Sequence, residues 1–411
     1  MPIQAYKSVD NYTMCTVFQM TPPMSPNDVA IVIFDQILNK TDTVVDIWCR
    51  PHLVLYMLHA QYVAGNVIKY LKNNFKILRT VPKMNYVAIP SAAIWRMLDG
   101  VLPCNTLFMG LNAYFNIRFT YPNSPTPDDL RIWSFIQTGI DHKLTNKLYN
   151  LNIKQIMDIW TMQTHCPVVN VIRDYSNNLV KISKEIHDKL DRKPYFIPVS
   201  YTKETNIDFV NTSENFNCLT QSNPEVEIYY DNKDKWFIAN ILQTGYYRVN
   251  YDTENWRMIA RYLNSDEYRN IHVINRAQII DDAFHLTIEK KLDFSIFWEL
   301  ASYLPRERNY VAWYPMIKVF ERISSVFAFS IHHEHPKKIK MLMGSLFKDI
   351  DEDMYDQMGP ANEDLNKYLK QELTKWGCLI NNSWCLKMAK KQFEWHRSDP
   401  ETRKNGSVYG S

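Results

Sequence analysis

The sequence predicts an α+β protein of several domains, because its pattern changes clearly along the 411 residues. Strands and helices mix as far as residue 166, short strands follow one another over residues 167–250, and a helical pattern continues from residue 251. A chain of this length has room for roughly two to four domains. Each pattern needs a different kind of packing, so the places where the pattern changes are the predicted domain boundaries.

The first part of the chain combines both kinds of element. Residues 29–34 and 43–48 are short and rich in β-branched residues, which is typical of strands. Elsewhere in this part, apolar and aromatic residues recur at the spacing of a helix face. Helices are predicted over residues 51–71, 94–115, 130–140 and 153–163.

Short strands without intervening helices begin at Pro167. Val169 and Val171 alternate with other residues, and Asn177-Asn178 predicts a turn. Residues 231–234 are polar and predict a hairpin loop between the last two strands. Further strands are predicted over residues 179–186, 196–201, 225–230 and 235–241. A run of this kind is typical of a small β-sandwich.

The pattern after Tyr251 is helical. Asp293 is placed to cap one helix, and Pro315 predicts the start of another. Paired helices with short connections indicate a solenoid-like array. One predicted helix face carries Ala277, Ile280, Phe284 and Ile288.

Composition argues against several classes of protein. Lys and Arg number 47 against 44 Asp and Glu, so the chain has no strong basic field for nucleic acid. Residues 1–10 lack the basic and apolar regions of a signal peptide. No window approaches the roughly 18 apolar residues of a membrane span. As written, the sequence predicts no nucleic-acid partner, export signal or anchor.

The cysteines and the possible glycosylation triplets do not decide between a secreted and a cytosolic protein. Cys378 and Cys385 would lie about 10 Å apart along an unbroken helix, too far for a disulfide. Asn381-Asn382-Ser383 can supply the break that a bridge needs. The alternative is a cytosolic chain with reduced thiols. Possible N-glycosylation triplets, which favour a secreted protein, begin at Asn11, Asn39, Asn211, Asn381 and Asn405.

Several motifs resemble the aminopeptidase N family of zinc metalloaminopeptidases. Residues 244–256 (TGYYRVNYDTENW) and 275–284 (NRAQIIDDAF) resemble the junction and first helix of the family's C-terminal region. Residues 156–171 resemble the end of its catalytic domain. Further similar stretches follow the family's order at residues 18–24, 47–52, 303–313 and 376–395.

Two groups of side chains within these motifs are expected to support the scaffold rather than chemistry. The aromatic residues Tyr246, Tyr247 and Tyr251 are expected in the core or in cross-strand pairs. The charged residues Arg276, Asp281 and Asp282 are expected in surface or interdomain ion pairs.

The resemblance implies a domain order for the whole chain. Residues 1–50 would be a remnant of an N-terminal β-domain, and residues 51–166 a truncated remnant of a thermolysin-like catalytic domain with a deletion at 90/91. Residues 167–250 would form the β-sandwich, and residues 251–411 an incomplete, solenoid-like helical domain. The family further implies peptide substrates and a plasma-membrane or extracellular location.

The chemistry of the family needs residues that this sequence lacks. In H-E-x-x-H, two histidines bind zinc and the glutamate is the general base. Relatives add another zinc-binding glutamate and a G-A-M-E-N loop. Neither motif occurs here, and the first glutamate in the chain is Glu185. We therefore expect no zinc, no metal-binding or catalytic residue and no activity in this chain.

Histidines do not replace the missing motif. No two of the four before Pro167 are four residues apart: His52, His59, His142 and His165. Residues 331–337 (IHHEHPK) contain the one histidine cluster of the sequence. This cluster is interpreted as a solvated helix end, with adventitious metal binding as the alternative.

The missing segment is placed at one junction. Residues 84–90 resemble the strand before the G-A-M-E-N loop, and residues 91–98 resemble the helix after the catalytic tyrosine. Three interpretations follow: an inactive family member, an incomplete version of an active membrane or secreted enzyme, or a scaffold that binds peptides or proteins through its helical domain. The sequence sets neither substrate preference nor oligomeric state.

Overall fold

The computed structural model divides the chain into two compact units, Met1–Gln163 and Thr164–Ser411, which we describe separately. The residues that it describes are 3–8, 14–18, 37–39, 45–49, 84–86, 91–102, 105–120, 128–141, 152–161, 166–185, 194–210, 216–326, 334–348, 350 and 364–398.

Short strands begin the first unit. β1 (Ile3–Ser8) and β2 (Met14–Phe18) form an antiparallel pair. A second sheet has the order β3-β4-β5, with β4 parallel to β5. Its strands are β3 (Ile37–Asn39), β4 (Val45–Cys49) and β5 (Met84–Tyr86). The predicted strand over residues 43–48 coincides with β4, whereas the strand over 29–34 and the helix over 51–71 lie outside the described residues.

Helices complete the first unit. They are α2 (Ser91–Val101), α3 (Thr106–Thr120), α4 (Asp128–Asp141) and α5 (Ile153–Thr161). The single helix predicted over residues 94–115 is wrong. Pro103 cannot donate a helical hydrogen bond, and Asn105 adopts the left-handed region (φ 63°), so the chain breaks between α2 and α3. The predictions that correspond to α4 and α5 are confirmed.

Close helix packing gives this unit its core. A Cβ atom at Gly110 would lie 2.8 Å from the Cα atom of Ile136, so only glycine allows α3 to approach α4 this closely. Ile136 is fully buried, and Trp160 of α5 is 2% exposed. The indole of Trp95 stacks on Trp133 with ring centroids 5.1 Å apart.

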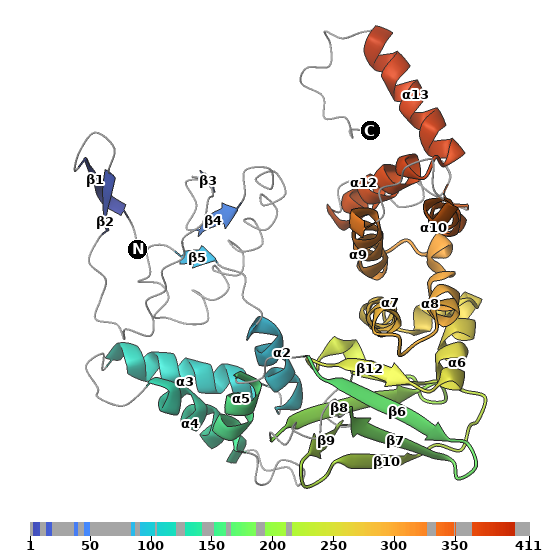
Figure 1. Ribbon diagram of the computed structural model, residues 1–411. Helices are drawn as coiled ribbons and strands as arrows, with labels where there is room; N and C mark the ends of the chain where they lie inside the picture. Colours follow the sequence, from blue (N-terminus) through green and yellow to red (C-terminus); the bar gives the residue numbers. More distant parts are fainter. Residues whose placement is uncertain are drawn as a thin grey trace. The chain divides into compact units, whose positions relative to one another are not determined.

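Two small sheets begin the second unit (Figure 1). One has the order β10-β7-β6-β12, and the other has the order β11-β8-β9. β12 runs parallel to β6, whereas the other pairs in these sheets are antiparallel. The strands are β6 (Val168–Asp174), β7 (Leu179–Lys184), β8 (Phe196–Lys203), β9 (Phe216–Thr220), β10 (Glu225–Tyr229), β11 (Phe237–Ala239) and β12 (Arg248–Tyr251).

The connection between β10 and β11 is not the predicted hairpin. β10 pairs with β7 and β11 pairs with β8, so residues 231–234 carry the chain from one sheet to the other. The side chain of Arg173 fixes this crossing, since it donates to the carbonyl oxygens of Asn232 (2.6 Å) and Lys235. β9 was not predicted from the sequence, because it is short and its polar residues hide the strand pattern.

A tyrosine joins the two sheets. The backbone amide of Ala239, in β11, donates to the hydroxyl oxygen of Tyr251, in β12, over 3.0 Å. Tyr251 and Tyr247 are buried, as predicted for core aromatics. Tyr246 is 37% exposed, so that part of the prediction is wrong. The aromatic run TGYY therefore alternates between the interior and the surface.

Helices follow β12 to the end of the described chain. They are α6 (Thr253–Leu263), α7 (Val273–Ile288), α8 (Phe294–Ala301), α9 (Tyr310–Val326), α10 (Glu334–Ser345), α12 (Asp364–Leu379) and α13 (Ser383–Ser398). Each of these helices from α6 to α9 packs on helices close to it in sequence. Asp293 caps α8 as predicted, and its carboxylate accepts from the amide of Ser295 over 2.8 Å.

Two details of this helical region differ from the predictions. Pro315 lies inside α9 rather than at its start, because Asn309 caps the helix earlier by accepting from the amide of Val311. Pro315 and its neighbours Trp313 and Met316 are all buried in this helix. Ile288, predicted on the same apolar helix face as Ala277 and Ile280, is 52% exposed at the end of α7.

We predict that Tyr251→Phe destabilises the second unit by about 1–3 kcal/mol, because the buried amide of Ala239 loses its acceptor. Urea unfolding followed by tryptophan fluorescence measures the change. Tyr229→Phe is the matched control, since Tyr229 is 63% exposed on β10 and should leave the unfolding midpoint unchanged. Equal midpoints for the two variants would contradict the bridging role of Tyr251.

Candidate functional site

Of the two residues at the predicted deletion junction, Pro90–Ser91, the structure describes only Ser91. β5 ends at Tyr86 and α2 begins at Ser91, whereas Pro90 lies outside the described residues. The four histidines that precede Pro167 also lie outside the described residues: His52, His59, His142 and His165. In the histidine cluster, His335 lies in the first turn of α10 and His332 is not described.

The residues present do not fit a zinc hydrolase site. Within the ranges that the structure describes, no group of three or more His, Cys, Asp or Glu side chains is placed to hold a metal ion. The complete sequence contains no H-E-x-x-H, which would supply two imidazoles and a general base. We therefore derive no reaction step through zinc in this chain.

A buried ionic cluster joins β12 to α7. The guanidinium of Arg248 lies 2.6 Å from a carboxylate oxygen of Asp281 and 3.0 Å from one of Asp282. Asp282 also accepts from the backbone amide of Val249 (3.0 Å) and from the side-chain amide of Gln278 (3.2 Å). The predicted ion pairing thus links the strand-rich and helical parts, although Asp282 is buried rather than at the surface.

Burial controls the protonation of this cluster. Desolvation raises the pKa of Asp282 to about 7, and the attraction of Arg248 opposes this shift. Burial and Arg248 both lower the pKa of His285, on the next turn of α7. Desolvation raises the pKa of the nearby Cys166 thiol to about 11. Cys166 is therefore a neutral thiol at physiological pH and a poor nucleophile.

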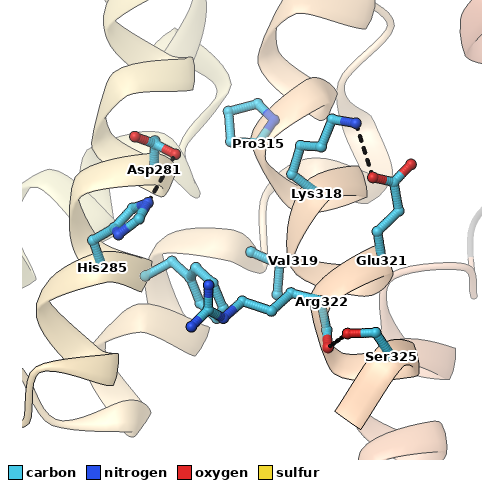
Figure 2. Close-up of a pocket in the computed structure, with 9 residues that line it drawn as sticks. Asp281, His285, Pro315, Lys318, Val319, Glu321, Arg322 and Ser325 are labelled. Atoms are coloured by element: carbon cyan, nitrogen blue, oxygen red, sulfur yellow. Dashed lines mark hydrogen bonds and ion pairs between the residues drawn. The ribbon is translucent and has the colours of Figure 1, made fainter. Parts of the chain in front are cut away.

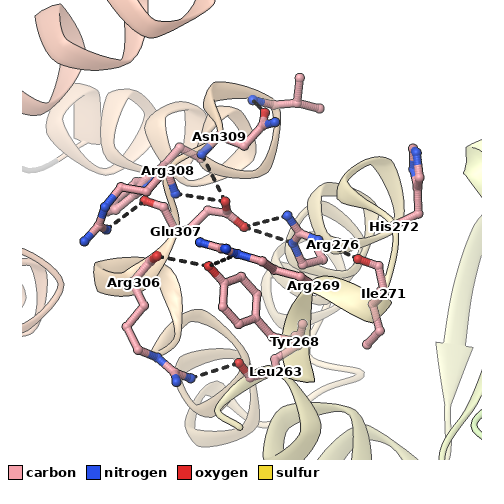
Figure 3. Close-up of polar contacts among 12 residues, drawn as sticks. Leu263, Tyr268, Arg269, Ile271, His272, Arg276, Arg306, Glu307, Arg308 and Asn309 are labelled. Carbon is pink, nitrogen blue, oxygen red and sulfur yellow. Dashed lines mark hydrogen bonds and ion pairs between the residues drawn. The ribbon is translucent and has the colours of Figure 1, made fainter. Parts of the chain in front are cut away.

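A second ionic cluster lies inside the helical region (Figure 3). Two guanidinium nitrogens of Arg276 lie 2.9 Å from one carboxylate oxygen of Glu307, and the two side chains are 7% and 4% exposed. The other carboxylate oxygen of Glu307 accepts from the backbone amides of Arg308 (2.9 Å) and Asn309 (3.0 Å). The prediction of a surface or interdomain role for Arg276 is wrong, because its partner is a buried glutamate that the helical region itself supplies.

The Arg276 and Glu307 pair fixes the loop between α8 and α9. Three guanidinium groups surround the ring of Tyr268, those of Arg269, Arg276 and Arg306, at 5.3–5.6 Å from its centroid. The hydroxyl of Tyr268 donates to the carbonyl of Arg306 over 3.0 Å. In these contacts the charged groups pack against Tyr268 and hold the backbone. They are not arranged as a catalytic acid and base would be.

A pocket of about 390 Å³ lies between α7 and α9 (Figure 2). Phe284, Pro315 and Val319 provide apolar surface, and Figure 2 shows the side chain of Arg322 reaching toward α7. Lys318 pairs with Glu321 over 2.8 Å. The full lining is Asp281, Phe284, His285, Pro315, Lys318, Val319, Glu321, Arg322 and Ser325. Such a pocket can accept a small group with an apolar body and a charge.

The sequence alone did not identify this pocket. Lys318, Arg322 and Ser325 recur at helical spacing on α9, but the same spacing describes an ordinary solvated face. What makes the pocket is the packing of α9 on α7, and no local pattern reports that contact.

A disulfide closes the turn between the last two helices. Cys378 and Cys385 are bonded, with Cα atoms 5.2 Å apart, and the turn at Asn381 brings them together. Of the possible glycosylation sites, Asn39 ends β3 and Asn381 lies in this turn. Asn11, Asn211 and Asn405 lie outside the described residues.

Comparison with known proteins supports the motifs found in the sequence. A family described as the ERAP1-like C-terminal domain matches residues 236–406. Aminopeptidase N of Plutella xylostella is 28% identical over 325 residues, which cover 77% of this chain and 33% of that protein. These matches support an aminopeptidase N family member. This confirms the resemblance drawn from the motifs.

Other members of the aminopeptidase N family show the same partial coverage. Aminopeptidase N of Rattus norvegicus is 32% identical over 233 residues, covering 54% of this chain and 22% of that protein. The thyrotropin-releasing hormone-degrading ectoenzyme of Homo sapiens is 29% identical over 252 residues, covering 57% and 23%. The chain thus spans at most about a third of these curated relatives. In the described part of this family member, every helix is too short or too polar to cross a membrane.

We predict that Asp282→Asn weakens the pH dependence of stability. The folded-state pKa of about 7 exceeds the ordinary value of 3.8, so the native carboxyl binds its proton more tightly than the unfolded one. This contribution to stability is complete below about pH 4 and is lost as pH rises toward 7, by at most about 1.4 kcal/mol per pH unit. Asparagine cannot titrate and removes the effect.

Urea unfolding of both proteins between pH 4 and 8 measures the difference. Asp281→Asn is the control, because it removes the neighbouring, partly exposed carboxylate of the same cluster. Parallel pH profiles for the wild type and Asp282→Asn would show that Asp282 does not retain its proton in the folded state.

Proposed function

We propose that this chain does not hydrolyse peptides, although it belongs to a family whose named relatives are aminopeptidases. The observation that carries the proposal is the lack of any glutamate before Glu185. The resemblance assigns this region to the family's catalytic machinery, which needs glutamates as zinc ligand, general base and amine-binding group. Aspartate is shorter and would not reach the same positions without a different backbone.

The remaining reactive groups do not offer a substitute. A hydrolase without a metal needs an activated nucleophile and a base within hydrogen-bond distance. Burial keeps the thiols of Cys166 and Cys218 protonated, because it raises their pKa to about 11 and about 12. Glu307 is engaged by a guanidinium and by backbone amides. These groups support a structural role.

Binding is the role that such a chain retains. The helical part presents the pocket between α7 and α9, which the cationic Arg322 and the aromatic Phe284 both line. A peptide or protein segment with an acidic and an apolar side chain complements this surface. Helical arrays commonly bind extended partners along one face.

We place this activity outside the cytosol. The disulfide between Cys378 and Cys385 supports an oxidising compartment. One relative carries the word ectoenzyme in its name, which is in line with this location.

The proposal predicts that the purified full-length chain contains far less than one equivalent of zinc and does not cleave leucine or alanine p-nitroanilide. Elemental analysis and absorbance assays measure both, with aminopeptidase N of Rattus norvegicus as the positive control. Zinc that disappears in the His335→Ala variant is adventitious binding at the histidine cluster. One tightly bound zinc together with turnover would overturn the proposal.

The second candidate is a longer, active aminopeptidase from the same gene, of which this chain is one version. The observation that favours it is the direct connection of two non-adjacent family segments at Pro90–Ser91. Sequencing transcripts across these codons distinguishes the candidates. An unbroken insertion that encodes H-E-x-x-H supports the longer enzyme, whereas transcripts that all join the two codons directly support the inactive chain.

A further inference from the structure

A short turn connects α12 to α13 (Figure 1), and the side chain of Asn381 in this turn is exposed. α12 ends at Leu379 and α13 begins at Ser383, so the chain reverses within a few residues. Asn381 occupies the left-handed region (φ 64°), which asparagine tolerates better than most residues. Its backbone amide donates to the carbonyl of Cys378 over 3.1 Å. The backbone therefore holds the turn without help from the Asn381 side chain.

The neighbouring asparagine has the opposite role. The side-chain oxygen of Asn382 accepts from the amide of Cys385 (3.2 Å) and caps α13. Its side-chain nitrogen donates to the carbonyl of Phe347 (3.0 Å). By contrast, the Asn381 side chain is exposed and makes no hydrogen bond within the described residues. The structure thus separates a structural asparagine from one whose amide nitrogen is free to react.

Asn381 also begins an Asn-x-Ser triplet. Ser383, the third residue of the triplet, is exposed at the first position of α13. Leu379 and Leu386, on either side of the turn, are 48% and 49% exposed. The disulfide that closes the turn forms in the same compartments in which N-glycosylation takes place.

We infer that Asn381 carries an N-linked glycan. The amide nitrogen of Asn381 loses one proton and forms a bond to the anomeric carbon of an oligosaccharide supplied on a lipid pyrophosphate. The bond between that carbon and the pyrophosphate oxygen breaks, and the lipid pyrophosphate leaves with the electron pair. The attached glycan then lies over the exposed leucines at this end of the helical region. This inference rests on the extracytosolic location proposed above.

The other triplets of the described chain do not present the same arrangement. Asn39 is the last residue of β3 and pairs with Ile47 of β4, so its backbone belongs to a sheet. Asn381 combines an exposed side chain, a fixed turn and an adjacent disulfide. This combination is why the inference concerns Asn381.

The test uses the full chain, fused to a cleavable signal peptide and expressed in mammalian cells. Material from the microsomal fraction and the medium is treated with peptide N-glycosidase in heavy-oxygen water, reduced and digested with trypsin. We expect the peptide of residues 376–387 to contain an isotope-marked aspartate at position 381 in most of the chains. An unmodified peptide from chains whose Cys378 and Cys385 are bonded would overturn the inference.

Matched variants separate the acceptor from the fold. Asn381→Gly fits the left-handed backbone and removes the acceptor, and Ser383→Ala removes the triplet while Asn382 still caps α13. Both should lose the same single glycan mass, whereas Ser383→Thr should keep it. A glycan mass that persists in Asn381→Gly would assign the modification to another site and contradict the inference.

The signal peptide sets the compartment in this experiment, so the result does not depend on where the native chain resides. The proposed location has its own test, which is protease protection of the chain in microsomes after expression without the added signal. The two proposals can therefore fail separately.

Discussion

The carboxylate of Asp282 is the constraint on which the second unit depends. It accepts from Arg248 and from the backbone of Val249, and so ties the last strand of one sheet to the middle of α7. α8 and α9 both pack on α7, so the position of this helix also affects theirs. Burying a carboxyl group is costly unless it has hydrogen-bond partners. Asp282 thus specifies one register of strand against helix.

Other buried polar groups extend this junction. The side chain of Asn240 exchanges hydrogen bonds with both backbone groups of Gly245, and its own carbonyl accepts from Asn275 of α7. Asn255 does the same for Phe237 from α6. Polar side chains therefore satisfy the irregular backbone where the sheets meet the helices, as buried amides require. The motif TGYYRVNYD is better understood as this connector than as part of a catalytic centre.

Sequence patterns predicted the elements whose signals are local. The helical spacing of apolar residues predicted α4 and α5, and the alternation of valines predicted β6. The capping residue Asp293 predicted the start of α8. The predictions are wrong where the structure depends on a contact with a residue that is distant in the sequence. The predicted hairpin between β10 and β11 is wrong because β10 pairs with β7 in one sheet and β11 pairs with β8 in the other. The predicted surface or interdomain role of Arg276 is wrong because its partner, Glu307, lies far from it in the sequence. Pro315 misled because Asn309 had already started the helix.

The candidate site shows the same division. The sequence alone shows that H-E-x-x-H is missing and that no glutamate precedes Glu185. The pocket between α7 and α9 is visible only in the structure, because its lining residues come from two helices whose packing the sequence does not predict. The distinction between Asn381 and Asn382 also came from geometry, because the two residues are chemically identical.

The parallel pairing of β12 with β6 affects how the chain is made. Asn170 and Asn250 lie opposite each other although 80 residues separate them along the chain. A ribosome adding 5–20 residues per second needs on the order of ten seconds to synthesise that interval. During this time the edge of β6 is without its partner and is open to pairing with other nascent strands. Chaperones or slow release from the ribosome would therefore matter most between the emergence of these two strands.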